Sequence, residues 1–204
     1  MNSGKFITFE GVEGSGKSTQ IKLAVDFLKE KGFPVILIRE PGTTVIGEEI
    51  RKILLNLKHK EIDNYCELFL FSASRAQLIR EIIKPALAKG KIVISDRFLD
   101  ATFCYQGYGS GISLEFIKKV NSFIELIPDL TILLDIDAQK GLERAEGNDR
   151  FEQISLSYHK RIRKGYLKLA SAEPERIKVV KVDGIEDTAC KIRKLLEKTL
   201  KYFS

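Results

Sequence analysis

The chain of 204 residues has no tryptophan, one methionine and three cysteines, and it contains no long hydrophobic run. Cys66, Cys104 and Cys190 are odd in number and far apart, which argues against a disulfide framework or a paired-cysteine metal site. We expect them to be reduced thiols of a cytoplasmic protein. No apolar segment reaches the roughly 18 residues that a membrane span needs. The first residues enter a strand-like pattern without the apolar stretch of a secretory signal, so we expect neither export nor a membrane partner.

Positive charge is in excess, since 34 Lys and Arg face 28 Asp and Glu, for a net charge of +6. Much of the excess lies between residues 150 and 181, where we expect a helix with a solvated basic face. A nucleic-acid interface is the alternative, but the chain has neither a ribonucleoprotein motif nor zinc-finger spacing. We therefore expect small anionic ligands and no nucleic-acid partner.

Short β-rich runs alternate with longer segments of helical period. The expected strands are 5–10, 35–39, 91–95, 130–135 and 177–182, and the expected helices include 47–57, 66–89 with a kink at Pro85, 114–127, 151–172 and 186–202. This order predicts a single three-layer α/β domain over residues 1–204, in which helices flank a five-stranded parallel sheet. Ligands of such sheets bind beyond the carboxyl ends of the strands, so we expect the chemistry there.

The segment Gly11-Val12-Glu13-Gly14-Ser15-Gly16-Lys17-Ser18 matches the phosphate-loop pattern G-x-x-x-x-G-K-[ST]. A strand precedes it and a helix follows it, as this motif requires. Glycines let successive backbone N–H groups converge on phosphate oxygens, and the helix adds its positive N-terminal end. Lys17 would reach the β- and γ-phosphates of a nucleotide, and the Ser18 hydroxyl would bind Mg²⁺. A glycine-rich turn with an incidental lysine is the alternative.

Further polar residues follow the third strand or lie on helices. Asp96 ends an apolar strand beside the loop, where a carboxylate can hold Mg²⁺ or, alternatively, cap a helix. Arg97 and Arg51 can each bind a phosphate, although a single arginine is more often a solvated surface charge. Phe71 and Arg75 are four residues apart and share a helix face. This pair suits a nucleobase, because the ring stacks while the guanidinium donates to a carbonyl; a core edge beside a surface charge is the alternative.

Four further segments accompany the loop: Arg39-Glu40-Pro41-Gly42, residues 68–75, Asp96-Arg97-Phe98 and Tyr105-Gln106-Gly107. Together they resemble the thymidylate kinase family of nucleoside monophosphate kinases, and the likeness runs from residue 5 to the last helix. The resemblance implies transfer of a phosphoryl group from ATP to dTMP, with Mg²⁺, by direct in-line displacement in dTTP synthesis. It also implies a homodimer packed through helices.

The resemblance assigns a role to each matching position. The residues expected to contact ATP are Gly11, Val12, Glu13, Gly14, Ser15, Gly16, Lys17, Ser18, Thr19 and Arg144. Those expected to contact dTMP are Arg39, Arg51, Phe71, Arg75, Arg97, Thr102, Tyr105 and Gln106. The expected catalytic residues are Glu13, Lys17, Arg97, Arg144 and Arg150, and the expected metal ligands are Ser18 and Asp96.

Four of these roles are specific to parts of dTMP. The resemblance implies that Phe71 stacks on thymine while Arg75 donates to its O4, and that Tyr105 packs against the deoxyribose. Glu13 would face the sugar 3′-hydroxyl or the attacking phosphate. The sequence also departs from the family pattern, since Thr43 replaces a glycine, Phe98 a tyrosine and Ala101 a serine. We expect the turn at Thr43 to differ locally.

The polar segment 141–152 resembles the family's lid over the triphosphate, with an ordinary helix–helix connection as the alternative. Some members of the family carry a basic residue inside the phosphate loop, and others supply it from the lid. Position 14 is glycine, so the chain resembles the second kind, with Arg150 as first candidate for the catalytic cation and Arg144 as second. Residues 183–185 would form the adenine loop.

Two alternative functions stay open from the sequence. One is another nucleotide or deoxynucleoside kinase, which would share the phosphate loop and the Asp-Arg step. The other is a nucleotide-dependent switch that contacts nucleic acid through its basic segment. The pairs Phe71–Arg75 and Tyr105–Gln106 favour thymidylate over both.

Overall fold

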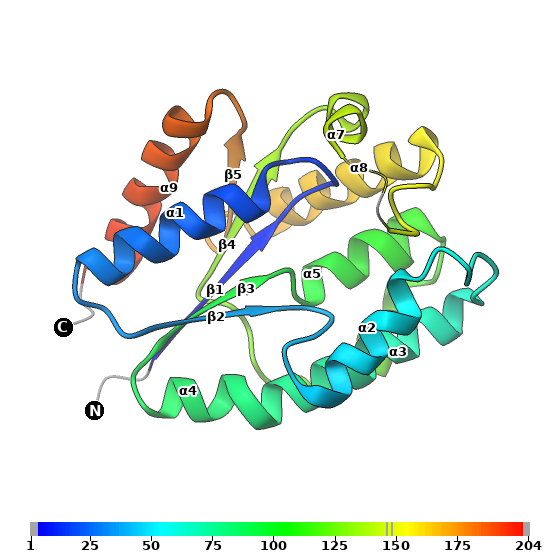
Figure 1. Ribbon diagram of the computed structural model, residues 1–204, viewed down its shortest axis with the longest axis horizontal. Coiled ribbons are helices and arrows are strands. Elements are labelled where there is room, and N and C mark those ends of the chain that lie inside the picture. Colours follow the sequence, from blue (N-terminus) through cyan, green and yellow to red (C-terminus); the bar gives the residue numbers. More distant parts are fainter. Residues whose placement is uncertain (1–3, 146, 148, 202–204) are drawn as a thin grey trace.

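The computed structural model describes residues 4–201 except 146 and 148, and its centre is one twisted parallel sheet (Figure 1). The five strands are β1 (Lys5–Glu10), β2 (Val35–Arg39), β3 (Ile92–Asp96), β4 (Leu130–Asp135) and β5 (Ile177–Lys181). They lie in the order β2–β3–β1–β4–β5, and each neighbouring pair is parallel. The predicted α/β fold with a five-stranded parallel sheet is confirmed, and strand bounds differ from the prediction by one residue at most.

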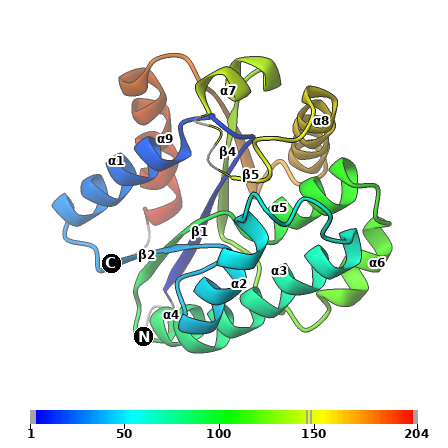
Figure 2. The same cartoon turned by 45° about the vertical axis from the view of Figure 1, so that its right-hand side comes forward.

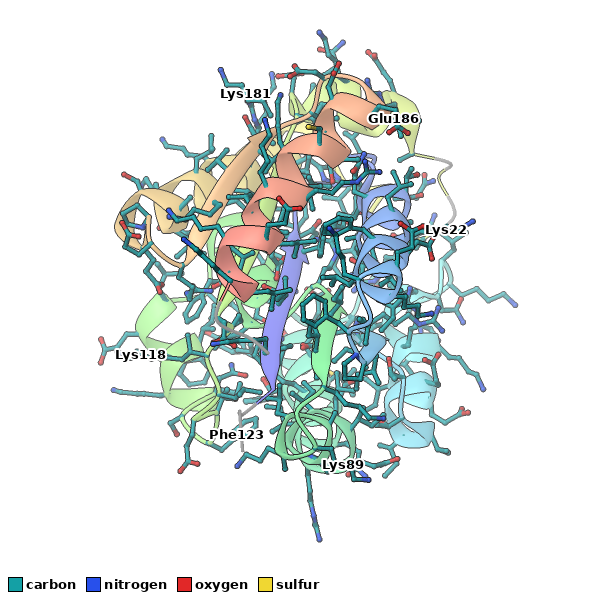
Figure 3. The ribbon with its side chains drawn as sticks, turned by 90° about the vertical axis from the view of Figure 1, so that its left-hand side faces the viewer. Lys22, Lys89, Lys118, Phe123, Lys181 and Glu186 are labelled. Carbon is teal, nitrogen blue, oxygen red and sulfur yellow. The ribbon has the colours of Figure 1, made fainter. Side chains whose placement is uncertain are left out.

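Helices cover both faces of the sheet (Figure 2). One face is covered by α1 (Lys17–Glu30) and α9 (Ile185–Leu200), whose buried apolar side chains pack against strand residues. Figure 3 shows these two helices in front of the strands, with the exposed side chains of Lys22 on α1 and Glu186 on α9. Removal of this apolar surface from water is the main stabilising contribution to the fold.

A continuous helical run lies against the opposite face. It consists of α3 (Asn64–Leu78), the π-helical turn η1 (Ile79–Ile83) and α4 (Lys84–Ala88). The sequence predicts one helix kinked at Pro85, and the structure instead widens the turn immediately before that proline. Proline lacks the N–H of a regular helix and its ring crowds the carbonyl of the preceding turn, which explains the position of the widening.

The segment after β3 forms two turns that the sequence pattern does not predict. These are α5 (Leu99–Thr102) and the π-helical η2 (Phe103–Gly109). Most of their residues are buried, so they lack the polar face that makes a helical period visible in a sequence. The turn η2 carries Tyr105 and Gln106 to the carboxyl end of the sheet.

Capping residues bound two further helices, one earlier and one later in the chain than this segment. The helix α2 (Val45–Leu55) begins where the Thr44 hydroxyl accepts the N–H of Gly47 at 2.9 Å. The helix α6 (Leu114–Val120) ends earlier than predicted, at the capping residue Asn121, whose side-chain Nδ2 donates to the Ile117 carbonyl at 2.9 Å.

The last two helices before β5 surround the predicted lid. They are α7 (Ala138–Arg144) and α8 (Leu156–Ala172). The sequence predicts that α8 begins at 151, but the Asp149 carboxylate accepts the N–H of Phe151 at 2.9 Å and turns the chain before the helix starts. Within the described ranges 4–145, 147 and 149–201, no helix is long and apolar enough to cross a membrane.

Candidate active site

One cavity of about 760 Å³ opens at the carboxyl ends of the strands. It is lined by the phosphate loop, by the segments after β2, β3 and β5, and by residues of α2, α3 and η2. The predicted site residues that line it are Glu13, Gly14, Ser15, Gly16, Lys17, Ser18, Thr19, Arg39, Arg51, Phe71, Arg75, Asp96, Arg97, Thr102, Tyr105, Gln106 and Arg144. Gly11 and Val12 are buried at the start of the loop, and Arg150 is not among the residues that line the cavity.

The phosphate loop lies directly against α7. Gly14 has a φ of 63°, and a Cβ at this position would lie 1.9 Å from the carbonyl oxygen of Gly141. A Cβ at Gly141 would in turn lie 2.4 Å from the carbonyl oxygen of Glu13. Position 14 therefore has no room for a basic side chain, and the close approach brings Arg144, the last residue of α7, to the cavity.

The Lys17 ammonium lies over the loop that it is expected to serve. Its Nζ donates to the carbonyl oxygens of Gly11 at 3.3 Å and Val12 at 3.2 Å. Burial lowers the pKa of Lys17, and the charge of the neighbouring Arg97 lowers it further. Movement away from the two carbonyls would make the same ammonium available to a phosphate.

Asp96 and Ser18 offer oxygen donors for a divalent cation. The Asp96 Oδ1 atom is buried and has no hydrogen-bond partner among the described residues, and Ser18 is an exposed residue of the same cavity. No group of three or more His, Cys, Asp or Glu able to hold a metal occurs in the part of the chain that the structure describes. Mg²⁺ commonly takes one or two protein oxygens and completes its shell with phosphate oxygens and water, so this donor set fits.

The Glu13 carboxylate is held by two neighbours from beyond β3. Its Oε1 accepts from Arg97 Nη2 at 2.7 Å and from the Tyr105 hydroxyl at 2.6 Å. Burial alone would raise its pKa, but the charges of Arg97 and Lys17 and the hydrogen bond from Tyr105 lower the pKa of Glu13 to about 2. The Glu13 carboxylate is thus ionised at neutral pH, and the charges of Arg97 and Lys17 balance it.

Arg97 adopts a strained backbone at this position. Its φ of 68° lies in the left-handed region, which costs a residue other than glycine roughly 1–3 kcal/mol. The Nη1 donor of Arg97 bonds the Gly11 carbonyl at 2.8 Å, and its guanidinium lies 4.8 Å from the centre of the Tyr105 ring. These contacts fix the guanidinium between the loop and η2.

A second buried carboxylate, Glu10, closes β1 behind the loop. It accepts from the backbone N–H of Phe98 at 2.8 Å and from the Tyr166 hydroxyl at 2.7 Å. Burial, and then the charge of Asp100, raises the pKa of Glu10 to about 8. Glu10 was not among the predicted site residues, although an acidic side chain that ends an otherwise apolar strand was the available signal.

Phe71 and Arg75 lie at the other end of the cavity. Arg75 is 1% exposed and donates to Asn121 Oδ1 at 2.8 Å and to Thr102 Oγ1 at 2.6 Å. It also forms an ion pair with the buried Glu40. Its Nε is buried without a hydrogen-bond partner among the described residues, which leaves a donor for a ligand.

Two further arginines line the cavity near the end of β2. Arg51 Nη1 donates to the Pro41 carbonyl at 2.9 Å, and Arg39 pairs with Glu48 at 2.9 Å. Thr43, at the position where the family pattern has glycine, has a φ of 71°. The turn thus adopts the left-handed conformation that glycine favours, and the Thr43 hydroxyl supports it by accepting the N–H of Arg39 at 2.9 Å.

Arg150 lies in the wall between α2 and α3. Its guanidinium forms an ion pair with the buried Glu67, and its Nε donates to the Leu54 carbonyl at 3.1 Å. Of the predicted lid segment, residues 146 and 148 lie outside the described part of the chain. Glu67 was not among the predicted site residues, although it stands four residues before Phe71 on the same helix face.

A parallel sheet with a phosphate loop and an aromatic–arginine pair across one cavity defines a nucleotide kinase of the phosphate-loop class. The family model described as thymidylate kinase matches residues 9–192. This chain belongs to the thymidylate kinase family, and its activity is the phosphorylation of dTMP to dTDP.

Individual relatives match over nearly their whole length. The thymidylate kinase of Desulforapulum autotrophicum is 48% identical over 194 residues, which cover 89% of this chain and 86% of the relative. That of Caldanaerobacter subterraneus is 41% identical over 204 residues, which cover 98% and 96%. The crystal structure of thymidylate kinase from Ehrlichia chaffeensis superposes with a TM-score of 0.81 at 35% identity, covering 96% of this chain and 99% of that one.

Proposed function

We propose that the cavity binds ATP at its phosphate-loop end and dTMP at its Phe71–Arg75 end, so that the γ-phosphoryl group passes directly between them. The observation that carries this proposal is the single cavity that joins the two ends. In-line transfer depends on positioning and on charge neutralisation, and it needs no covalent intermediate.

At the ATP end, the backbone N–H groups of residues 11–16 and the N-terminus of α1 would bind the phosphates. Lys17 would exchange the carbonyl oxygens of Gly11 and Val12 for the β- and γ-phosphates. Asp96 and Ser18 would hold Mg²⁺, which when bound neutralises phosphate charge. Residues 183–185 line the cavity after β5 and would hold the adenine.

At the dTMP end, Arg39, Arg51 and Arg97 would bind the monophosphate. Phe71 would stack on the base, with Thr102 and Gln106 beside it. Arg75 has five N–H donors, of which protein groups engage three, so its Nε and one Nη1 donor remain for the base carbonyl O4.

The sugar of dTMP would lie between these groups and the phosphate loop. The Tyr105 ring would pack against the deoxyribose, where a ribose 2′-hydroxyl would crowd it. Glu13, which is ionised, would accept from the sugar 3′-hydroxyl or approach the attacking phosphate through Arg97.

The lid arginine that stabilises the transferring phosphoryl group would be Arg144. It lines the cavity beside the phosphate loop, and position 14 has no room for a cation of its own. Arg150, the first candidate from the sequence, would act on the phosphoryl group only after leaving Glu67 and the Leu54 carbonyl.

The chain would form a homodimer through α3 and α6. Tyr65 and Phe69 on α3 and Phe116 on α6 make an exposed aromatic patch, with exposed fractions of 51%, 50% and 37%. The Phe116 ring lies 5.5 Å from that of Tyr65 and 6.5 Å from that of Phe69. A contiguous exposed apolar patch of this kind favours burial against a second protein surface.

Coupled measurement of ADP release tests the substrates. With ATP and Mg²⁺ present, each nucleoside monophosphate is supplied in turn, and dTMP should give the highest kcat/KM. Release of ADP with another monophosphate but not with dTMP would overturn the proposal.

A further inference from the structure

A buried carboxylate on α3 joins two parts of the active site. Glu67 is 3% exposed, and its Oε1 accepts from the side-chain amide Nε2 of Gln106 at 2.7 Å. Its other oxygen, Oε2, accepts from Arg150 at the end of the lid segment. Glu67 itself does not line the cavity, so it acts on bound nucleotide only through these two partners.

The contact with Gln106 determines which end of the amide faces a ligand. Because Nε2 donates to Glu67, the amide is held by its nitrogen, and the carbonyl oxygen is the acceptor of Gln106 left for the cavity that it lines. Thymine carries an N–H donor at N3, whereas cytosine carries an acceptor there. An amide fixed with its oxygen outward therefore accepts from thymine and repels cytosine.

The contact with Arg150 fixes the end of the lid segment. Arg150 also donates from Nε to the Leu54 carbonyl at 3.1 Å, and its guanidinium lies 4.5 Å from the centre of the Phe151 ring. Phe151 lines the cavity, and its ring centre lies 5.8 Å from that of Tyr105. The same carboxylate thus holds the amide that faces the base and the segment that carries an aromatic wall of the pocket.

We propose that Glu67 is a positioning residue for dTMP, which orients the Gln106 amide with its oxygen toward the base and fixes the lid end through Arg150. This inference rests on the proposed place of Gln106 in the base pocket. A merely structural ion pair between α3 and the lid end would stabilise the fold without setting the hydrogen-bond pattern offered to the base.

The substitution Glu67→Gln tests the orientation with little change of volume. The new amide at position 67 can accept from Arg150 through its oxygen, and its NH₂ group then faces Gln106. The Gln106 amide must turn over to accept from that NH₂ group, so it offers a donor to the base instead of an acceptor. We expect the KM for dTMP to rise about tenfold or more, the usual consequence of one lost hydrogen bond in a buried site. The KM for ATP should stay within about twofold, and dCMP, tested as a competitive inhibitor, should bind no more weakly than to the unchanged chain.

The double substitution Glu67→Gln with Gln106→Glu exchanges donor and acceptor between the two positions. It again places an oxygen acceptor at the cavity, so the KM for dTMP should return to within about threefold of the starting value. The matched control is Glu49→Gln, the same chemical change on the exposed face of α2, where Glu49 pairs with Lys52; its kinetics should be unchanged. Thermal melting of each variant confirms that it is folded.

The outcomes separate this inference from the proposed pocket. Gln106→Leu should raise the KM for dTMP; if it does not, the place of Gln106 in the base pocket is wrong and the inference falls with it. If Gln106→Leu raises that KM and Glu67→Gln does not, the role of Glu67 is overturned. A loss in Glu67→Gln that the exchange fails to recover also overturns it. If Glu67→Gln does not fold, Glu67→Asp is the second variant. Its shorter side chain keeps a negative charge for Arg150 but no longer reaches Gln106, so an unchanged KM for dTMP in this variant would contradict the proposal.

Discussion

At the residue scale, the site keeps two carboxylates beside one phosphate loop in different protonation states. Glu13 meets Arg97 and Lys17 and has its pKa lowered to about 2, whereas Glu10 is buried near Asp100 and has its pKa raised to about 8. At neutral pH the first is ionised and the second protonated. Environment rather than residue type therefore sets the charge around the loop.

Glu10 should make the stability of the fold depend on pH. Its folded-state pKa lies above the unfolded value of about 4.5, so the folded chain holds this proton more tightly. The stabilisation is complete below about pH 4.5 and is lost as the pH rises toward 8, by at most about 1.4 kcal/mol per pH unit. Glu10→Gln mimics the protonated form, so the melting temperature of this variant should rise relative to that of the unchanged chain as the pH goes from 5 to 8. A difference in melting temperature that stays constant over this pH range would contradict the raised pKa.

At the scale of elements, the contact between the phosphate loop and α7 supports the proposal that the catalytic cation comes from the lid. Gly14 and Gly141 approach too closely for either to carry a side chain, and this approach brings Arg144 to the cavity. Arg150 lies in a wall of the pocket, paired with Glu67. The two lid arginines should therefore give different phenotypes.

Arg144→Ala should lower kcat at least about 100-fold with a modest change in the KM for dTMP, since an arginine on a transferring phosphoryl group is worth about 10³–10⁵ in kcat. Arg144→Lys should recover little of the lost kcat, because lysine lacks the planar fork of arginine.

Arg150→Ala should instead lower the melting temperature, because it leaves the Glu67 charge buried without its partner. Single-turnover kinetics and thermal melts of both variants measure these effects. An unchanged chemical step in Arg144→Ala would remove Arg144 from the mechanism.

The sequence predicted the sheet and the phosphate loop because both follow local rules. Strands of a parallel sheet are continuous apolar runs, and the loop is a contiguous pattern of glycine, lysine and serine. It missed η2, because a segment buried nearly all round has no amphipathic period. It also missed Glu67, Glu40 and Asn121, whose roles come from partners far away in the chain. A lone arginine in a polar segment does not reveal whether it faces a cavity or a buried carboxylate, so the sequence placed Arg150 before Arg144 without a sign that Arg150 pairs with Glu67.

At the scale of the whole molecule, the aromatic patch of Tyr65, Phe69 and Phe116 lies on α3 and α6, and α3 also lines the cavity. Phe69 stands two residues from Phe71 on α3, so one helix serves the exposed patch and the cavity. A second copy on this patch would cover the outer side of the helix that carries Phe71 and Arg75.

Light scattering should give a mass near twice the 23.1 kDa of one chain. Phe69→Glu would place a charge in the buried patch of the dimer and should shift the mass toward that of a single chain. A mass of one chain at all concentrations would contradict the dimer. A variant that stays dimeric would show that the contact lies elsewhere.

In the proposed function, one cavity holds ATP and dTMP end to end. A single molecule that joins adenosine and thymidine through a polyphosphate chain tests it directly, because such a compound spans both ends only if they open into each other. Steady-state inhibition and calorimetry should show that it binds one molecule per chain, competes with ATP as well as with dTMP, and binds far more tightly than either. Competition with only one of the two substrates, or binding no tighter than that substrate alone, would contradict the end-to-end arrangement.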